Sequence, residues 1–320
     1  MSTYQKLINE IHEPNQLKNL RINLIKEIES ITNRPLIVYA SNFLKNVPIP
    51  LPNSIDESDI IGFSDLITNI SDSNIDVIIH SPGGSAEATE RIVSLLYQNF
   101  KSVRFIVPHS AYSAATLMVL SGESILMNEK SALGPIDQQV FDPFTGRFVP
   151  AQSILYGFEK ARKVLEKEGP KAMPVYLPLL SKYDFTIFEI CENAISFSKE
   201  IACKFLKEYM KVDKSKAEEI ADFLCSHKEH LTHRRAIDIS TAKRIGLKVI
   251  DLRENEKLNS SIWNLYCAID LFFDRSNAVK LYENSQGISW SKNFSIQQPR
   301  PIQIELPIPS IPQSNPPEAK

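Results

Sequence analysis

The chain has 320 residues, of which 43% are hydrophobic and 23% are charged, and its formal net charge at pH 7 is −2. This composition is typical of a soluble globular protein, and the length suffices for one large domain or two small ones. A nearly neutral chain without a basic stripe offers no electrostatic attraction to nucleic acid or to acidic membranes, so we expect neither as a partner.

The cysteines and the N-terminus indicate the compartment. Cys191, Cys203, Cys225 and Cys267 lie far apart and form no C-x-x-C pair. They fit reduced thiols in a reducing compartment better than a disulfide framework or a zinc site. No run approaches the roughly 18 apolar residues that would span a bilayer, and the N-terminal segment lacks the apolar region of a signal peptide. We therefore expect a cytoplasmic protein without a membrane span.

The first 70 residues contain regular elements but no sign of chemistry. Residues 16–31 carry leucine and isoleucine at helical spacing and predict an amphipathic helix. Pro35–Tyr39 is typical of a strand, and residues 56–70 predict a second helix. Between these two elements, residues 45–53 contain three prolines, which favours an extended loop.

Residues 75–139 alternate short apolar runs with helical patterns. The predicted elements are strands at 77–79, 103–107 and 124–127, and helices at 86–100 and from Ser113 onwards. Such alternation favours a parallel sheet covered by helices. In parallel sheets, ligands bind at the carboxyl ends of the strands. Two turns stand at such ends, namely Gly83-Gly84 and residues 110–113.

Three motifs in this region point to a known family. They are S-P-G-G at 81–84, A-Y-S-A-A-T at 111–116 and S-A-L-G-P-I-D-Q-Q at 131–139. In this order they resemble the serine dehydrogenase proteinase family, which belongs to the Clp-protease/crotonase fold group together with the Clp proteolytic subunit and bacterial signal peptide peptidase. The resemblance covers Arg34–Gln139 and returns at Thr232–Val249. It implies a Clp/crotonase-like α/β fold, with a parallel sheet and flanking helices.

Ser113 is the candidate nucleophile. It follows a predicted strand and opens a predicted helix, where a hydroxyl gains from the helix dipole and lies beside backbone N–H groups without intrahelical partners. Most serines at helix starts are N-caps, however, and Ser110 competes both as cap and as nucleophile. The family pattern has its nucleophile directly before the Ala-x-Thr step, and this selects Ser113 for an acyl-enzyme.

The glycine turn is the candidate oxyanion hole. Gly83 and Gly84 permit positive φ and let a backbone come close to a substrate. A tight strand-to-helix turn of this kind occurs in many α/β proteins without any catalytic role. Because the serine motif follows one strand later, we favour the interpretation in which N–H groups of this turn face a developing oxyanion. The amide of Ala114 is a natural second contributor.

A serine nucleophile needs a base. The Clp proteolytic subunit has its catalytic histidine in the segment that corresponds to residues 131–137, where this chain has none; Asp137 stands close to that position. His233 falls where the Clp subunit keeps its triad aspartate, and a histidine has a suitable pKa for general base catalysis. Lys182, before a helix, compares with the lysine base of the signal peptide peptidases. We rank His233 first and leave both dyads, Ser–His and Ser–Lys, open.

The rest of the chain predicts a long insertion and a tail. Residues 141–225 form a mainly helical insertion with helices at 153–168 and 184–210, and residues 261–280 predict a further helix. We expect residues 1–295 to form one domain. Residues 296–320 are rich in proline and show no apolar period, which predicts a disordered tail.

The histidines near position 230 raise the question of a metal site. His227, His230 and His233 recur three residues apart, but only Glu229 and Cys225 accompany them, so we expect no metal and no cofactor. The hypothesis is a serine peptidase that acts on peptide or protein substrates, and the resemblance implies a homo-oligomer. One alternative is an acyl-CoA-processing enzyme on the same scaffold, for which a nucleophilic serine would be superfluous. The other is a non-catalytic scaffold or partner-binding protein, which the missing Clp-type histidine keeps open.

Overall fold

A mostly parallel sheet forms the centre of the molecule. The computed structural model describes residues 3–45, 52–142, 144–181, 183, 185–230, 232 and 235–294. The sheet has seven strands in the order β11-β10-β1-β2-β3-β5-β9. Their bounds are β1 (Leu36–Ser41), β2 (Asn74–His80), β3 (Ser102–Ile106), β5 (Ser124–Met127), β9 (Val249–Asp251), β10 (Ala278–Asn284) and β11 (Ser289–Asn293). The strands from β1 to β9 run parallel, whereas β10 and β11 extend the sheet in antiparallel fashion.

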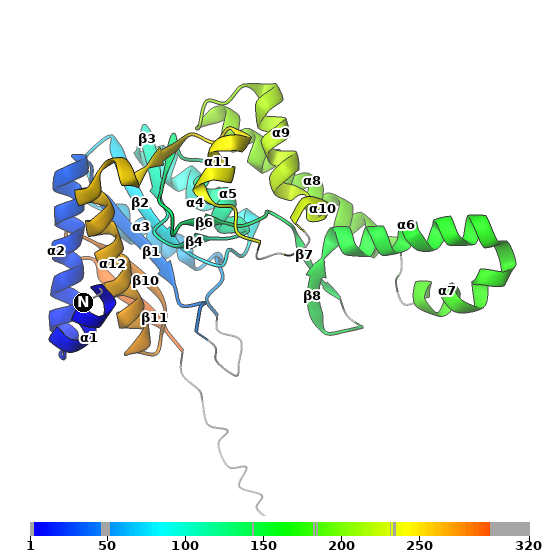
Figure 1. Ribbon diagram of the computed structural model, residues 1–320, viewed down its shortest axis with the longest axis horizontal. Coiled ribbons are helices and arrows are strands. Elements are labelled where there is room, and N and C mark those ends of the chain that lie inside the picture. Colours follow the sequence, from blue (N-terminus) through cyan, green and yellow to red (C-terminus); the bar gives the residue numbers. More distant parts are fainter. Residues whose placement is uncertain are drawn as a thin grey trace, which may run out of the picture.

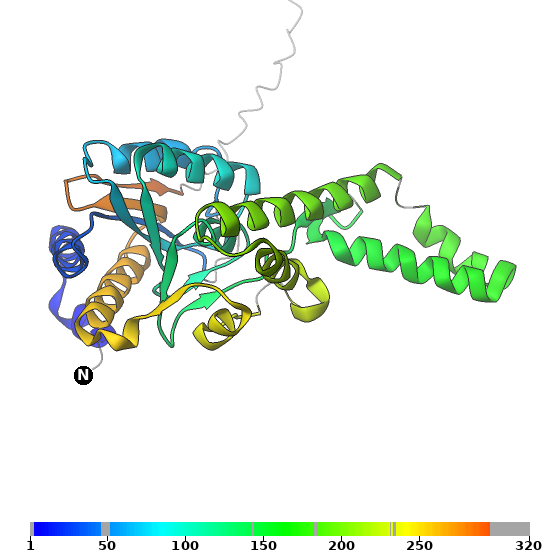
Figure 2. The ribbon, with the colours of Figure 1, turned by 90° about the horizontal axis from the view of Figure 1, so that it is seen from above.

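Helices cover both faces of this sheet (Figures 1 and 2). The helices on one face are α1 (Thr3–Glu10), α2 (Pro14–Thr32) and α12 (Glu256–Asp274). Those on the other are α3 (Asp59–Ile67), α4 (Ala86–Asn99) and α5 (Ala114–Val119), with α8 (Phe185–Glu208) and α9 (Lys214–Cys225) packed beside them. Side chains of β1 alternate between the two cores: Val38 packs towards α2 and α12, and Tyr39 towards α3. Because both faces are buried, the strand is a continuous apolar run.

Two small strand pairs and an extended pair of helices complete the fold. The paired strands are β4 (Ser110–Ala111) with β6 (Ala132–Leu133), and β7 (Gln139–Asp142) with β8 (Arg147–Pro150). The remaining elements are α6 (Ala151–Glu168), η1 (Gly169–Ala172), α7 (Met173–Leu180), α10 (His227–His230), α11 (Ile239–Ile245) and η2 (Leu252–Glu254). In both views α6 and α7 extend away from the sheet (Figures 1 and 2).

The expected α/β architecture is confirmed, and two segments differ from the prediction. The helix predicted at 261–280 ends at Asp274, and Lys280 lies in the middle of β10. All seven residues of β10 are buried, including Lys280 and Glu283, whose charged partners are distant in sequence. In β10, the alternation of apolar and charged residues therefore does not indicate that one face of the strand is exposed to solvent. The insertion also contains the β7–β8 hairpin, which the sequence did not indicate, ahead of the first predicted helix.

Two further expectations concern the C-terminal tail and the absence of a membrane span. The predicted disordered tail, residues 296–320, lies outside the described residues. Within the described ranges, none of the helices combines the length and the hydropathy needed to cross a bilayer. The proline-rich stretch between the helices predicted at 153–168 and 184–210 contains η1 and α7, and Pro178 lies inside α7.

Two helical glycines should respond oppositely to the same substitution. In α3, a Cβ on Gly62 would lie 2.1 Å from the Tyr282 ring, so Gly62→Ala should destabilise the protein by about 1–3 kcal/mol through overpacking. In α6, a Cβ on Gly157 would meet nothing within 4 Å. Gly157→Ala should therefore stabilise the protein by up to about 1 kcal/mol, because alanine favours a helix. Urea denaturation of both variants measures these changes; equal effects would show that Tyr282 does not pack against α3 in this way.

Candidate active site

Ser113 stands in a strained turn between β4 and α5. Its backbone angles, φ 53° and ψ −120°, are rare for a residue with a side chain and cost about 1–3 kcal/mol. Hydrogen bonds on both sides hold this geometry: the Tyr112 amide donates to the Ser81 carbonyl at 3.0 Å, and the Leu117 amide donates to the Ser113 carbonyl at 3.0 Å. The Ser113 side chain is half-buried. Strain that persists only because its surroundings enforce it is typical of functional sites.

Thr116 fixes the start of α5 from inside. Its buried hydroxyl lies 2.7 Å from the Ala111 carbonyl and 2.9 Å from the Gly134 carbonyl, and the Gly134 amide donates back to it at 3.1 Å. The threonine of the A-x-S-A-x-T motif thus joins the serine turn to the A-L-G-P motif. Sequence reasoning used Thr116 only as part of a pattern and missed this structural role.

The glycine turn after β2 touches the serine turn directly. A Cβ on Gly83 would lie 2.4 Å from the Tyr112 carbonyl oxygen and 2.8 Å from the Ser113 Cβ, and Gly83 has φ 93°. A Cβ on Gly84 would lie 2.2 Å from the Ile55 carbonyl oxygen. Both positions therefore require glycine, Gly83 because of the serine turn and Gly84 because of the segment that precedes α3.

The amides at this contact face different partners. The Gly83 amide donates to Ser81 Oγ at 3.2 Å. The Ile55 segment pairs with the turn through Ile55 N–H to Gly83 O, 2.7 Å, and Ser85 N–H to Ile55 O, 2.9 Å. Since N–H groups alternate in an extended segment, the Gly84 amide faces away from Ile55. Among the hydrogen bonds of the described residues, none is donated by the amides of Gly84 or Ala114.

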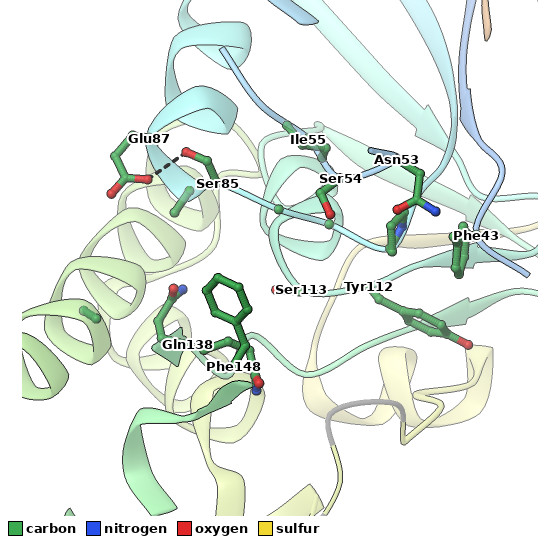
Figure 3. A pocket seen from close by; sticks show the side chains of 16 residues that line it. Phe43, Asn53, Ser54, Ile55, Ser85, Glu87, Tyr112, Ser113, Gln138 and Phe148 are labelled. Atoms are coloured by element: carbon green, nitrogen blue, oxygen red, sulfur yellow. Dashed lines mark hydrogen bonds between the residues drawn. The ribbon is translucent and has the colours of Figure 1, made fainter. Parts of the chain in front are cut away.

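A cavity of about 700 Å³ lies at the contact between the two turns. Its lining includes Gly83, Gly84 and Ser113, together with residues of the β7–β8 hairpin and of the segment before α3. In the view of Figure 3 the Phe148 ring lies near Ser113, while Phe43 and Tyr112 lie together at one end. A volume of this size is typical of sites for small molecules or for a few residues of a peptide.

Ser110, the competing serine, is fully buried. Its hydroxyl lies 2.7 Å from His109 Nδ1 and donates to the Tyr112 hydroxyl at 3.3 Å. It is not among the residues that line the cavity with Ser113. Of the two candidate serines, only Ser113 is accessible from this cavity.

Both candidate bases, His233 and Lys182, lie outside the described residues. Among the described side chains, none forms a hydrogen bond with the Ser113 hydroxyl. Asp137 is buried beside Gln138 and close to His230. Burial lowers the pKa of His230, while its contact with the Phe223 carbonyl and the charge of Asp137 act in the opposite direction. The described residues also include no group of three histidine, cysteine, aspartate or glutamate side chains that could hold a metal ion.

A buried ion network holds the segment that pairs with the glycine turn. Lys280 of β10 lies 2.9 Å from Asp56 and 2.9 Å from Asp59, and neither Lys280 nor Asp59 is exposed. Asp59 also accepts hydrogen bonds from the Asp56 amide, 2.8 Å, and from the hydroxyls of Tyr39 and Tyr282. Burial alone would raise the pKa of Asp56, but hydrogen bonds from Ser58 and Lys280 lower it to about 2. Because Asp56 follows Ile55, the network anchors the strand pairing at Gly84.

Comparison with known proteins gave one matching family model and two curated relatives. The model of the ClpP-like SDH-type serine proteinases matches residues 6–266. Two uncharacterized proteins of Methanocaldococcus jannaschii are similar to this chain. The first is 29% identical over 238 residues, 73% of this chain and 74% of the relative; the second is 30% identical over 233 residues, 72% and 71%.

Solved structures show more distant similarity. Two variants of the membrane-bound stomatin-specific protease 1510-N align with TM-scores of 0.42 and 0.41 at 15% identity; the alignments cover 65% and 76% of this chain and 79% and 84% of theirs. The second of these structures contains a substrate peptide. A variant of ClpP1 from Listeria monocytogenes aligns with a TM-score of 0.37 at 13% identity, over 72% of this chain and 98% of that one.

Breaking the buried network should destabilise the protein strongly. Lys280→Met removes the fully buried cation of Asp59 and leaves only the partly exposed Lys292 beside it, which should cost up to about 3–5 kcal/mol. The matched control is Lys292→Met: Lys292 contacts the same carboxylate at 3.2 Å, but its side chain is 26% exposed, so its loss should cost less than about 1 kcal/mol. Chemical denaturation compares the two variants. Equal losses would contradict the proposed difference between the buried and the exposed lysine.

Proposed function

Since the chain belongs to the family of ClpP-like SDH-type serine proteinases, we propose that it hydrolyses peptide bonds through an acyl-enzyme on Ser113. The observation that carries this proposal is the contact between the two turns. Ser113 and Gly84 both line one cavity of about 700 Å³, and the amide nitrogen of Ala114, the residue after Ser113, lies beside Gly83. A nucleophile beside two N–H groups without protein acceptors is the arrangement that acyl transfer requires.

The proposed reaction has two steps. Ser113 Oγ attacks the carbonyl carbon of the scissile bond while its proton passes to the base. The amides of Gly84 and Ala114 donate hydrogen bonds to the oxyanion of the tetrahedral intermediate. The base returns the proton to the leaving amine as the C–N bond breaks, and water then hydrolyses the ester by the same route. Gly83, whose amide already donates to Ser81, contributes the close approach of the two turns.

We propose His233 as the base, with Lys182 as the alternative. Four residues after His233 the chain pairs with β6: Leu133 and Ile237 exchange hydrogen bonds of 3.0 and 2.8 Å. Leu133 in turn pairs with Ala111, two residues before Ser113. Next to Lys182, the Tyr183 hydroxyl donates to Asp142 at 3.5 Å, at the β7–β8 hairpin. The segment that follows His233 is thus hydrogen-bonded, through β6, to the strand that precedes Ser113. This pairing supports His233 over Lys182 as the base.

We also propose that copies of the chain associate. Large apolar side chains of the insertion are exposed, with Phe144, Phe148, Val175 and Leu177 between 56% and 69% accessible. Exposed apolar side chains of this size support the presence of an interaction surface on the insertion. Light scattering should give a mass that is a multiple of 36.2 kDa, and a monomer at micromolar concentration would contradict association.

We propose a reducing compartment, the cytoplasm, as the place of action. All four cysteines are free thiols. Three of them, Cys191, Cys225 and Cys267, are buried, and burial raises the pKa of each thiol, which makes them unreactive. Fractionation of cells with an antibody against the protein tests this proposal, and recovery outside the cytoplasmic fraction would contradict it.

Ser113→Ala should abolish labelling by a fluorophosphonate and lower peptidase activity by at least about a thousandfold, because it removes the nucleophile. The matched control is Ser110→Ala, three residues away. It removes a buried hydroxyl that hydrogen-bonds His109 and Tyr112, so it should cost about 1 kcal/mol of stability and keep labelling. Labelling that survives in Ser113→Ala and disappears in Ser110→Ala would reverse the assignment. A parent protein that never labels would favour the non-catalytic alternative.

The pH dependence of labelling separates the two bases. A histidine base loses activity as it protonates, so the labelling rate should fall to half near about pH 6–7 as the pH is lowered. A lysine base stays protonated up to its own depressed pKa, so the rate would continue to rise in alkaline solution. His233→Gln should remove labelling while Lys182→Met leaves the profile unchanged. The opposite pair of results would assign the role to Lys182, and two unchanged profiles would exclude both.

A further inference from the structure

A second cavity, of about 550 Å³, lies beside α1 and α12 at the carboxyl edge of the sheet. Leu44 and Lys45, which follow β1, and His109, which follows β3, form part of its wall, and the other described lining residues come from the two helices. None of these residues lines the Ser113 cavity. Ligands of parallel α/β sheets bind at this edge, so the position is that of a binding site.

The charges around this cavity do not balance. Lys45 pairs with Asp274 at 3.2 Å and also donates to the Phe273 carbonyl, while the Tyr4 hydroxyl donates to the other oxygen of Asp274 at 2.5 Å. Among the ion pairs between described residues, none includes Asp270. Burial raises the pKa of Asp270, and burial lowers the pKa of His109 on the opposite wall. Lys45 and the Tyr4 hydroxyl act in the opposite direction on the pKa of Asp270, but both are shared with Asp274, so one lysine faces two carboxylates and the cavity has an excess of negative charge.

Aromatic rings line the same cavity as this carboxylate. The Tyr266 ring stacks on His109 with the centroids 5.2 Å apart, and Trp263 lies 5.4 Å from Tyr266. The ammonium of Lys130 lies over the Trp263 ring at 4.9 Å, so this indole already binds an ammonium on one face. Electron-rich ring faces attract organic cations, and a half-buried carboxylate strengthens that attraction.

We propose that this cavity binds a small molecule with a primary ammonium group on an apolar or aromatic body. The ammonium would lie at Asp270 and the body against Trp263 and Tyr266. The excess negative charge at Asp270 would repel an anion. A metal ion is disfavoured because the described residues offer no group of ligands for one. The volume is within the range of small-molecule sites. The proposal does not depend on the peptidase activity, because the two cavities share no described lining residue.

Trp263 provides a direct readout. The chain has two tryptophans, and Trp290→Phe leaves Trp263, in the cavity wall, as the only one. In this background, titration with 2-phenylethylamine should change the indole fluorescence in a saturable way. 2-Phenylethanol, which has the same ring and no charge, should bind at least tenfold more weakly. Asp270→Asn should weaken 2-phenylethylamine at least tenfold and remove its preference over the alcohol.

Two controls exclude indirect effects. A carboxyl whose pKa is raised by folding destabilises the native state once ionised, so Asp270→Asn should keep or raise the melting temperature at pH 7. Loss of binding in that variant is then not loss of fold. Ser113→Ala should bind 2-phenylethylamine like the parent. The proposal is overturned by equal binding of the alcohol, by unchanged affinity in Asp270→Asn, by lost binding in Ser113→Ala, or by no saturable change up to about 10 mM, where a millimolar site is mostly filled.

Discussion

The contact between the Gly83 turn and the Ser113 turn is the constraint on which the site depends. The two turns follow neighbouring parallel strands, and hydrogen bonds between Ser81 and residues 110 and 112 join them. No side chain fits between them, because a Cβ on Gly83 would lie 2.7 Å from the Ala114 amide nitrogen. Main-chain contacts therefore bring the Ser113 turn against the glycine turn, and the hydroxyls of Ser81 and Thr116 hold the two turns in place. A site built from backbone in this way is preorganised, since it needs no side-chain rearrangement.

Strand β10 supports this contact through a series of ion pairs and hydrogen bonds. Lys280 in β10 binds Asp59 and Asp56, Asp56 follows Ile55, and Ile55 pairs with the glycine turn. A buried lysine with two carboxylates is a costly arrangement if stability alone matters, because desolvation opposes the attraction. The position of this ion network indicates a structural role, because it fixes one register of the 53–56 segment against Gly84.

Much of the fold could be read from the sequence, and the reasons for the exceptions are physical. Strands β2, β3 and β5 are short apolar runs bounded by turns, so their local pattern suffices. β10 was missed because its charged residues are neutralised by Arg21 and Asp59, far away in the chain. The hairpin β7–β8 was missed because its exposed phenylalanines, at 141, 144 and 148, recur at a helical spacing and do not indicate two strands.

The features of the candidate site also fall into those that local motifs predict and those that depend on long-range contacts. Ser113 and the two glycines belong to contiguous motifs, and the motif order was enough to bring them together. The Ile55 contact, the role of Thr116 and the Asp270 cavity depend on side chains that meet only after folding, and no local pattern marks them. The general base is likewise a long-range question, because both candidates, His233 and Lys182, are distant from Ser113 in the sequence.

A crystal structure of the protein after phosphonylation of Ser113 tests the central claim most directly. The phosphoryl oxygen of the adduct takes the place of the oxyanion. We predict that it lies about 2.7–3.1 Å from the amide nitrogens of Gly84 and Ala114, the distance of an oxyanion hole. An adduct whose oxygen points away from both amides would contradict the account, even if Ser113 were the residue modified.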